Sequence, residues 1–149
     1  MKKLIFRNAL ITLMALLGIG AIYGGGLLII SPSGELLGVP HELLEPSPFD
    51  SFLIPGIILF FVLGVMPIVL AFALVRKFDI KLFQKLNVFK DMHWSWSFSI
   101  YVSFALIIWI QVQMVLLNAV HWAYTLYIFW AIIMLALALL PQVRNKYRN

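Results

Sequence analysis

Residues 52–75 read FLIPGIILFFVLGVMPIVLAFALV and contain no Asp, Glu, Lys or Arg. A helix needs about 20 apolar residues to cross the hydrocarbon layer of a bilayer. Further stretches of similar length that also lack these charged residues are 9–30, 97–117 and 119–140. The pattern predicts an all-α integral membrane protein, built as a bundle of four transmembrane helices over these ranges.

The composition of the whole chain supports the same class. Of its 149 residues, 63% are hydrophobic and 11% are charged, and the mean hydropathy is +1.01. A soluble domain carries about 25% charged residues, so this chain has too few of them for a surface that faces water on all sides. We expect one membrane domain over residues 1–149.

The basic residues predict the orientation in the membrane. All 11 Lys and Arg lie in residues 2–7, 76–90 and 144–148, and such segments stay in the cytoplasm. We therefore expect a multi-pass protein of the bacterial inner membrane, with both termini and the basic loop 76–93 in the cytoplasm. The start MKKLIFRN also resembles a signal peptide, but the apolar run after it is too long and lacks an A-x-A site, which favours an uncleaved anchor.

The segment between the first two spans, residues 31–50, reads SPSGELLGVPHELLEPSPFD. It has four carboxylates and no Lys or Arg, its prolines restrict the chain, and Pro40 is suited to the first turn of a short helix. We expect a structured extracytoplasmic loop that covers the outer mouth of the bundle. The pattern PSGELLGVP…SPFDSFLIPG resembles a loop in small, uncharacterised bacterial four-span membrane proteins. That resemblance implies the same topology and no particular activity.

Small residues and prolines predict how the helices pack. Gly20 and Gly24 form a GxxxG motif, to which Gly18, Gly25 and Gly26 add. Such small residues favour close helix contact in lipid, and the alternative is a backbone opened to a ligand near residues 23–26. Pro67 predicts a kink in the second span. Trp94 and Trp96 are expected at the inner membrane interface. A basic amphipathic helix in the headgroup layer is predicted from Leu82, Phe83, Leu86 and Phe89. The residues of the fourth span expected to face the bundle are His121, Tyr124, Ile128, Ala131, Leu135 and Ala138.

The candidate ligand-binding residues are the polar side chains in the outer half of spans three and four: Gln111, Asn118, His121 and Tyr124. Gln111 and Asn118 are seven residues apart and share a helix face, whereas Gln113 lies about 200° from Gln111 and is expected to look elsewhere. Amides within lipid need hydrogen-bond partners. The cluster is therefore either a set of interhelical hydrogen bonds or a pocket for a headgroup or small ligand.

Several kinds of chemistry have no support in the sequence. The chain has no Cys, which excludes disulfides and thiol chemistry, and no span holds a carboxylate of the kind that proton-coupled transporters use. His41, Glu42 and Glu45 could meet His121 around a metal, but no spacing typical of zinc sites supports this. We expect no metal, no cofactor, no catalytic set and no binding to nucleic acid.

Three classes of function remain. The expected one is a non-enzymatic membrane protein that binds a lipid or lipophilic small molecule, or that supports a membrane partner. An alternative is a membrane enzyme acting on a lipid headgroup at the outer face, with His121 as acid or base beside Glu42 or Glu45. The other alternative is an oligomeric channel or facilitator. The expected partners are membrane lipids, with a second copy of the chain or another membrane protein as further candidates.

Overall fold

The computed structural model describes residues 2–35, 48, 50–116 and 122–148, and this part of the chain is helical without any strand. Four helices in it are long and apolar enough to cross a membrane, namely Ile5–Ile30, Leu53–Arg76, Trp94–Val115 and Trp122–Leu139. The prediction of an all-α chain with four helices able to cross a membrane is confirmed for the described residues. The predicted lid, the Asn118 and His121 positions and the possible metal ligands of the loop lie outside the described residues.

The first span is α1 (Lys2–Ile30), and the third and fourth are α5 (Trp94–Leu116) and α6 (Trp122–Leu139). The second span consists of α2 (Leu53–Phe60), a π-helical segment η2 (Phe61–Val65) and α3 (Met66–Arg76). Short helices outside the spans are α4 (Lys81–Leu86), α7 (Pro141–Arg144) and the 3₁₀ turn η3 (Asn145–Tyr147).

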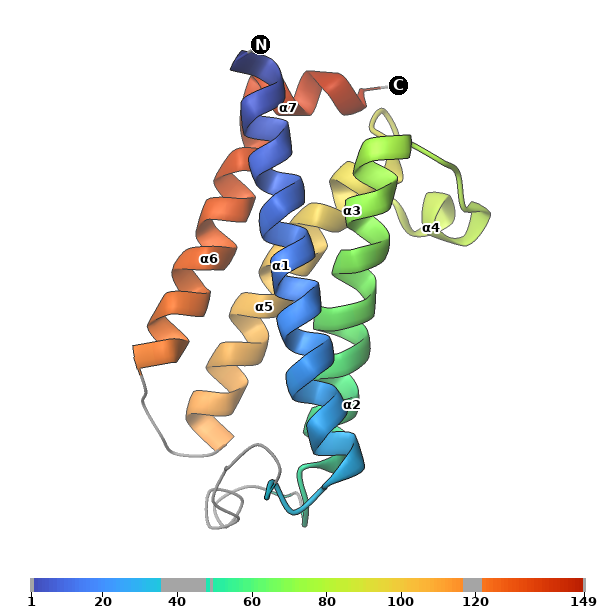
Figure 1. Cartoon of the computed structure of the whole chain (residues 1–149). Coiled ribbons are helices and arrows are strands. Elements are labelled where there is room, and N and C mark those ends of the chain that lie inside the picture. The colour runs from blue at the N-terminus through green and yellow to red at the C-terminus, as the bar shows by residue number, and fades with distance from the viewer. Residues whose placement is uncertain (1, 36–47, 49, 117–121, 149) are drawn as a thin grey trace.

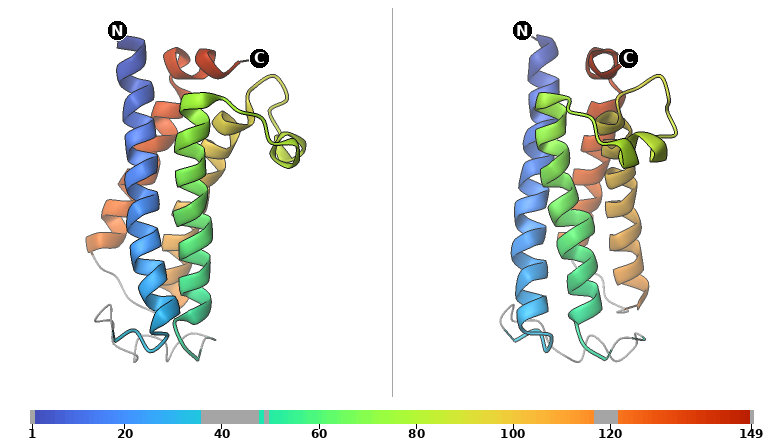
Figure 2. Two further views of the ribbon diagram at one scale, coloured as in Figure 1. Left: turned by 45° about the vertical axis from the view of Figure 1, so that its right-hand side comes forward. Right: turned by 90° about the vertical axis from the view of Figure 1, so that its right-hand side faces the viewer.

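Both termini lie at one end of the helices, which we call the termini end (Figure 1). The opposite end, where α1 finishes and α2 begins, is called the loop end. Helix α1 runs beside α2 and α3 along its length, and α5 runs beside α6 (Figure 2). Helix α4 projects sideways from the bundle near the termini end, and α7 lies across the top of that end (Figures 1 and 2).

Glycines bring α1 and the second span into backbone contact, but only some of the glycines expected take part. A Cβ added at Gly25 would lie 2.7 Å from the Phe60 nitrogen and 2.8 Å from the Gly56 oxygen, and one at Gly18 would lie 2.8 Å from the Gly64 oxygen. An added Cβ at Gly20 would meet nothing within 4 Å. The prediction of close packing is therefore confirmed for Gly18 and Gly25, because the neighbouring helix places its own glycines opposite them. It is wrong for Gly20, and Gly24 reaches only an ordinary side-chain contact with Leu59.

The π-helical segment is the way in which the second span accommodates Pro67. The Met66 N–H donates to the carbonyl of Phe61, five residues earlier, directly before the proline. Proline has no N–H to offer the preceding turn, and a single wider turn is a recognised cause of local bending in helices. The distortion expected at Pro67 is thus present as this turn, in Phe61–Val65.

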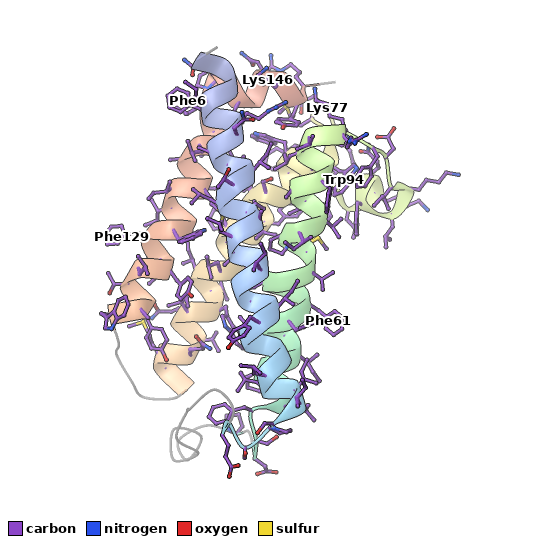
Figure 3. The ribbon with its side chains drawn as sticks, in the orientation of Figure 1. Phe6, Phe61, Lys77, Trp94, Phe129 and Lys146 are labelled. Carbon is purple, nitrogen blue, oxygen red and sulfur yellow. The ribbon has the colours of Figure 1, made fainter. Side chains whose placement is uncertain are left out.

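The faces of α6 are those that its sequence predicts. Ala131 and Ala138 are buried, whereas Phe129 and Ile133 are exposed on the outside of the bundle. Figure 3 shows Phe129 pointing away from the bundle, as Phe6 and Phe61 do from their own helices. Exposed apolar side chains on helices of this length suit contact with lipid chains.

The termini end is more enclosed than the sequence suggests. Trp94 and Trp96 are buried, and their indole N–H groups donate to the carbonyls of Phe78 (2.9 Å) and Ala138 (2.7 Å). The chain around α4 and the end of α6 cover them, so they do not face outward as the side chains of an aromatic belt do. Their level at the inner interface stays a prediction. The predicted short helix is present as α4, where Phe83 packs on Trp94 with a centroid distance of 5.0 Å.

Candidate functional site

Two of the four predicted ligand-binding residues can be located. Gln111 lies on the exposed side of α5, and Tyr124 is partly buried on α6. Asn118 and His121 lie outside the described residues. Gln111 and Tyr124 therefore differ in their surroundings, and only Tyr124 borders a cavity within the bundle.

A cavity of about 430 Å³ lies within the bundle, in the half nearer the loop end. Four helical segments form its walls, because α1 and α6 each turn one face toward α5 and the second span. Its lining residues are Leu16, Leu17, Gly20, Ala21, Tyr23, Gly24, Leu59, Leu63, Leu106, Trp109, Ile110, Gln113, Ala123, Tyr124, Leu126, Tyr127 and Trp130. None of them is charged.

The α5 wall of the cavity contains Gln113 and not Gln111. Leu106, Trp109 and Ile110 precede Gln113 at intervals of three and four residues, so the four side chains share one face of α5. The sequence contains this signal, since the spacing links Gln113 to an apolar and aromatic face. The prediction instead followed the seven-residue spacing between Gln111 and Asn118. Its expectation that Gln113 points elsewhere than Gln111 agrees with the structure, in which only Gln113 lines the cavity.

A hydrogen bond across two helices closes the cavity toward the termini end. The Trp130 indole N–H donates to the carbonyl of Leu13, 3.2 Å away, and so ties α6 to α1. Beyond this bond α1 and α6 diverge toward the loop end (Figure 1). Exposed side chains of both helices, among them Tyr23 and Leu126, border the cavity. The cavity is thus accessible from the side of the bundle between α1 and α6.

The backbone of Gly20 leaves part of this space open. A Cβ at Gly20 would meet no atom within 4 Å, and one at Gly24 would meet only Leu59 at 3.7 Å. Gly20 is itself exposed, so a larger side chain there would project into the open side of the cavity without colliding with a neighbouring backbone. The motif that the sequence suggests for packing therefore contributes the α1 wall of the cavity.

A second polar cluster, which the sequence reasoning missed, lies at the termini end. The Nδ1 atom of His93 lies 2.7 Å from the Ser95 hydroxyl and accepts the Ser95 N–H at 3.2 Å. Its Nε2 atom lies 3.4 Å from an Asp79 carboxylate oxygen. The order of groups resembles that of a hydrolytic Ser-His-Asp triad, but Ser95 is 0% exposed and no substrate can reach its hydroxyl.

This cluster has a structural role that its geometry explains. His93 directly precedes α5, and its ring nitrogen accepts a backbone N–H of the first turn, as an N-cap side chain does. Burial lowers the pKa of His93 below its ordinary value of 6.5, while the nearby Asp79 opposes that shift. The ring is accordingly neutral near pH 7 and serves as a hydrogen-bond acceptor.

The end of the chain completes the same cap. The Tyr147 hydroxyl donates to the Leu74 carbonyl at 2.7 Å, and the Tyr147 carbonyl accepts the His93 N–H at 2.6 Å. Lys77 donates to the Lys146 carbonyl and lies 5.1 Å from the centre of the Tyr147 ring; Figure 3 shows both lysines at this end. Burial raises the pKa of Tyr147 to about 12, so the hydroxyl keeps its proton.

Metal ligation has no support within the described ranges, where no group of three or more His, Asp or Glu could hold an ion. The set suggested by His41, Glu42, Glu45 and His121 lies outside those ranges and stays a hypothesis.

Comparison with known protein families, curated proteins and solved structures finds no match to this chain. The resemblance of the chain from the first span to the start of the second to small bacterial four-span proteins therefore stays a prediction. The cavity is the candidate site.

Proposed function

We propose that the protein is a non-enzymatic, multi-pass membrane protein that binds a lipophilic molecule in the cavity between α1, α5, α6 and the second span. The observation that carries this proposal is the cavity itself, with its volume of about 430 Å³ and its uncharged, aromatic-rich lining. Sites for small molecules typically have about 300–1,000 Å³ and combine apolar walls with a few polar groups. Gln113 and the three tyrosines are those groups here.

The proposed location is the bacterial inner membrane, with the termini end in the cytoplasm. This orientation is supported by the sequence, because every Lys and Arg belongs to the N-terminal segment, the connection around α4 or the C-terminal tail. The cavity would then open within the outer leaflet. A ligand dissolved in that leaflet could enter between α1 and α6 and need not cross water.

The two alternative functions have less support from the geometry. An enzyme requires a catalytic group that substrate can reach; His121, Glu42 and Glu45 lie outside the described residues, and the Ser-His-Asp arrangement within them is enclosed. A channel requires a polar path from one end to the other, and the cavity ends at the hydrogen bond from Trp130 to Leu13. A binding protein requires neither.

The test is to fill the cavity without disturbing the helices. Gly20→Leu introduces a side chain into open space, and Ile19→Leu, on an exposed neighbouring position, is the matched control. The probe is 12-bromododecanol, whose bromine quenches indole fluorescence at contact, added to protein in phosphatidylcholine vesicles. A Trp122→Phe background removes the most exposed indole, so that Trp109 and Trp130 in the cavity wall dominate the response.

Saturable quenching is expected in the parent and in Ile19→Leu, with a loss of the saturable part in Gly20→Leu at an unchanged unfolding temperature. Equal quenching in all three proteins would show only partition into lipid, and the proposed function would then be wrong.

A further inference from the structure

We propose that the cavity selects its ligand by charge and binds amphiphiles with one apolar chain and a cationic headgroup, such as a quaternary ammonium. This inference depends on the proposed function and specifies the ligand class of the same site. It rests on the distribution of polar groups along the cavity, on the charges around its loop end and on its aromatic lining.

The cavity is polar at one end only. Toward the middle of the bundle its walls come from Leu17, Leu63 and Leu106, and Trp130 closes it there. Toward the loop end, α5 contributes Gln113 and α1 and α6 contribute Tyr23 and Tyr124. An elongated molecule with one polar end can therefore satisfy both regions in one orientation, with its apolar chain directed to the middle of the bundle.

The charges near the loop end have one sign. No Lys or Arg occurs between Arg7 and Arg76 or between Lys90 and Arg144, and these two stretches contain all of the cavity lining. The connection from α1 to α2, which begins and ends at the loop end, has four carboxylates, of which Glu35 and Asp50 are exposed in the structure. An anionic headgroup would find no cation to pair with, whereas a cationic one would be attracted within the screening length of about 8 Å.

The aromatic side chains favour the same ligand. Tyr23, Tyr124 and Tyr127 line the cavity together with Trp109 and Trp130. The faces of aromatic rings carry negative partial charge and attract ammonium groups, and quaternary ammonium ligands are commonly held by several such rings. The rings toward the loop end can thus solvate a cation that lacks hydrogen-bond donors, while Trp130 at the closed end leaves its chain in apolar surroundings.

The experiment compares three probes with the same brominated C12 chain, in phosphatidylcholine vesicles and the Trp122→Phe background. They are 12-bromododecyltrimethylammonium, 12-bromododecanol and 12-bromododecanesulfonate, and the binding of each is taken as the difference between the parent protein and Gly20→Leu. The cation is expected to bind at least about ten-fold more tightly than the sulfonate, with the alcohol between them. Added salt should weaken only the binding of the cation.

A second variant separates the contribution of an aromatic ring to cation binding from the effect of the cavity volume. Tyr23→Leu removes an exposed ring at the edge of the cavity but keeps an apolar side chain there. It should lower the affinity for the ammonium probe more than that for the alcohol, whereas Ile19→Leu should change neither.

Each result identifies the hypothesis that fails. If the alcohol binds and the three probes have equal affinities, or the sulfonate binds best, the charge selection is wrong and the binding function stands. If none of the probes distinguishes the parent from Gly20→Leu, both proposals are wrong.

Discussion

His93 connects three parts of the termini end through one residue. Its backbone N–H bonds to the Tyr147 carbonyl, its Nδ1 atom accepts the N–H of Ser95, and its Nε2 atom faces Asp79. A protonated ring would lose the acceptor that α5 uses, and burial opposes the charge as well. The residue is therefore a point at which the stability of the fold responds to pH.

We predict that the protein becomes less stable as the pH falls below about 6.5, the ordinary pKa of histidine. Because burial lowers the pKa of His93 in the folded state, the unfolded state takes up the proton first. The stability is thus complete above 6.5 and is lost as the pH falls through the lowered pKa. His93→Asn cannot take up a proton, and its side-chain oxygen can still accept the Ser95 N–H.

The check is the unfolding temperature of parent and variant between about pH 5 and 8. The parent should lose more stability on acidification than His93→Asn, and the other two histidines serve as an internal control because both proteins retain them. Parallel curves would mean that His93 does not contribute to the pH response.

At the scale of the helix, glycines in α1 have two opposite functions. Gly18 and Gly25 let the backbone of the second span approach, whereas Gly20 leaves space for the cavity. The helical repeat explains this difference, since Gly18 and Gly25 are seven residues apart and share one face, whereas Gly20 lies on another. One helix therefore packs tightly on one side and stays open on the other.

A matched pair of alanine variants tests this division. Gly25→Ala should destabilise the bundle by about 1–3 kcal/mol, because its methyl group would meet backbone atoms at 2.7–2.9 Å and extra volume in a packed region has that cost. Gly20→Ala should be neutral or slightly stabilising, since alanine favours the helix by up to about 1 kcal/mol. Thermal unfolding in detergent measures both, and equal effects of the two changes would contradict the structure.

The elements show why the sequence predicts some features and not others. The buried face of α6 is predictable because one helix has its own periodic pattern, and Ala131 and Ala138 follow it. The contacts of Gly25 and the burial of Trp94 are not predictable in that way, because they depend on which segments return to cover them. The cavity has the same origin, since Gln113 becomes a lining residue only when α1 and α6 are placed beside α5.

At the scale of the whole molecule, the charges and the helical ends divide the protein into two halves. The termini end has all of the Lys and Arg and a hydrogen-bonded cap of protein groups, and the loop end has four carboxylates and the wider part of the bundle. An asymmetry of this kind determines the insertion of membrane proteins. It is also the basis for the charge selection that we propose.

The orientation can be measured directly because the chain has no native cysteine. Glu35→Cys at the loop end should react with a membrane-impermeant maleimide added to intact cells, and Lys85→Cys on α4 should react only after the cells are opened. Both positions are exposed in the structure, so access to the thiol depends on the side of the membrane alone. Reaction of Lys85→Cys in intact cells would reverse the proposed topology.

Because the cavity opens sideways, a ligand competes with lipid chains for it, and this competition affects the measured affinity. Acyl chains surround a membrane protein at very high concentration, and an unfilled apolar volume of about 430 Å³ forfeits the packing contacts of its walls. We therefore expect a lipid chain to occupy the space whenever no ligand does, so that ligand binding exchanges one molecule for the other. The observed free energy of binding is the difference between the free energies of binding of the ligand and of the lipid chain. It therefore varies with the length and abundance of the chains in the surrounding lipid. Such an exchange also releases little water from apolar surface, and calorimetry should find a heat-capacity change close to zero.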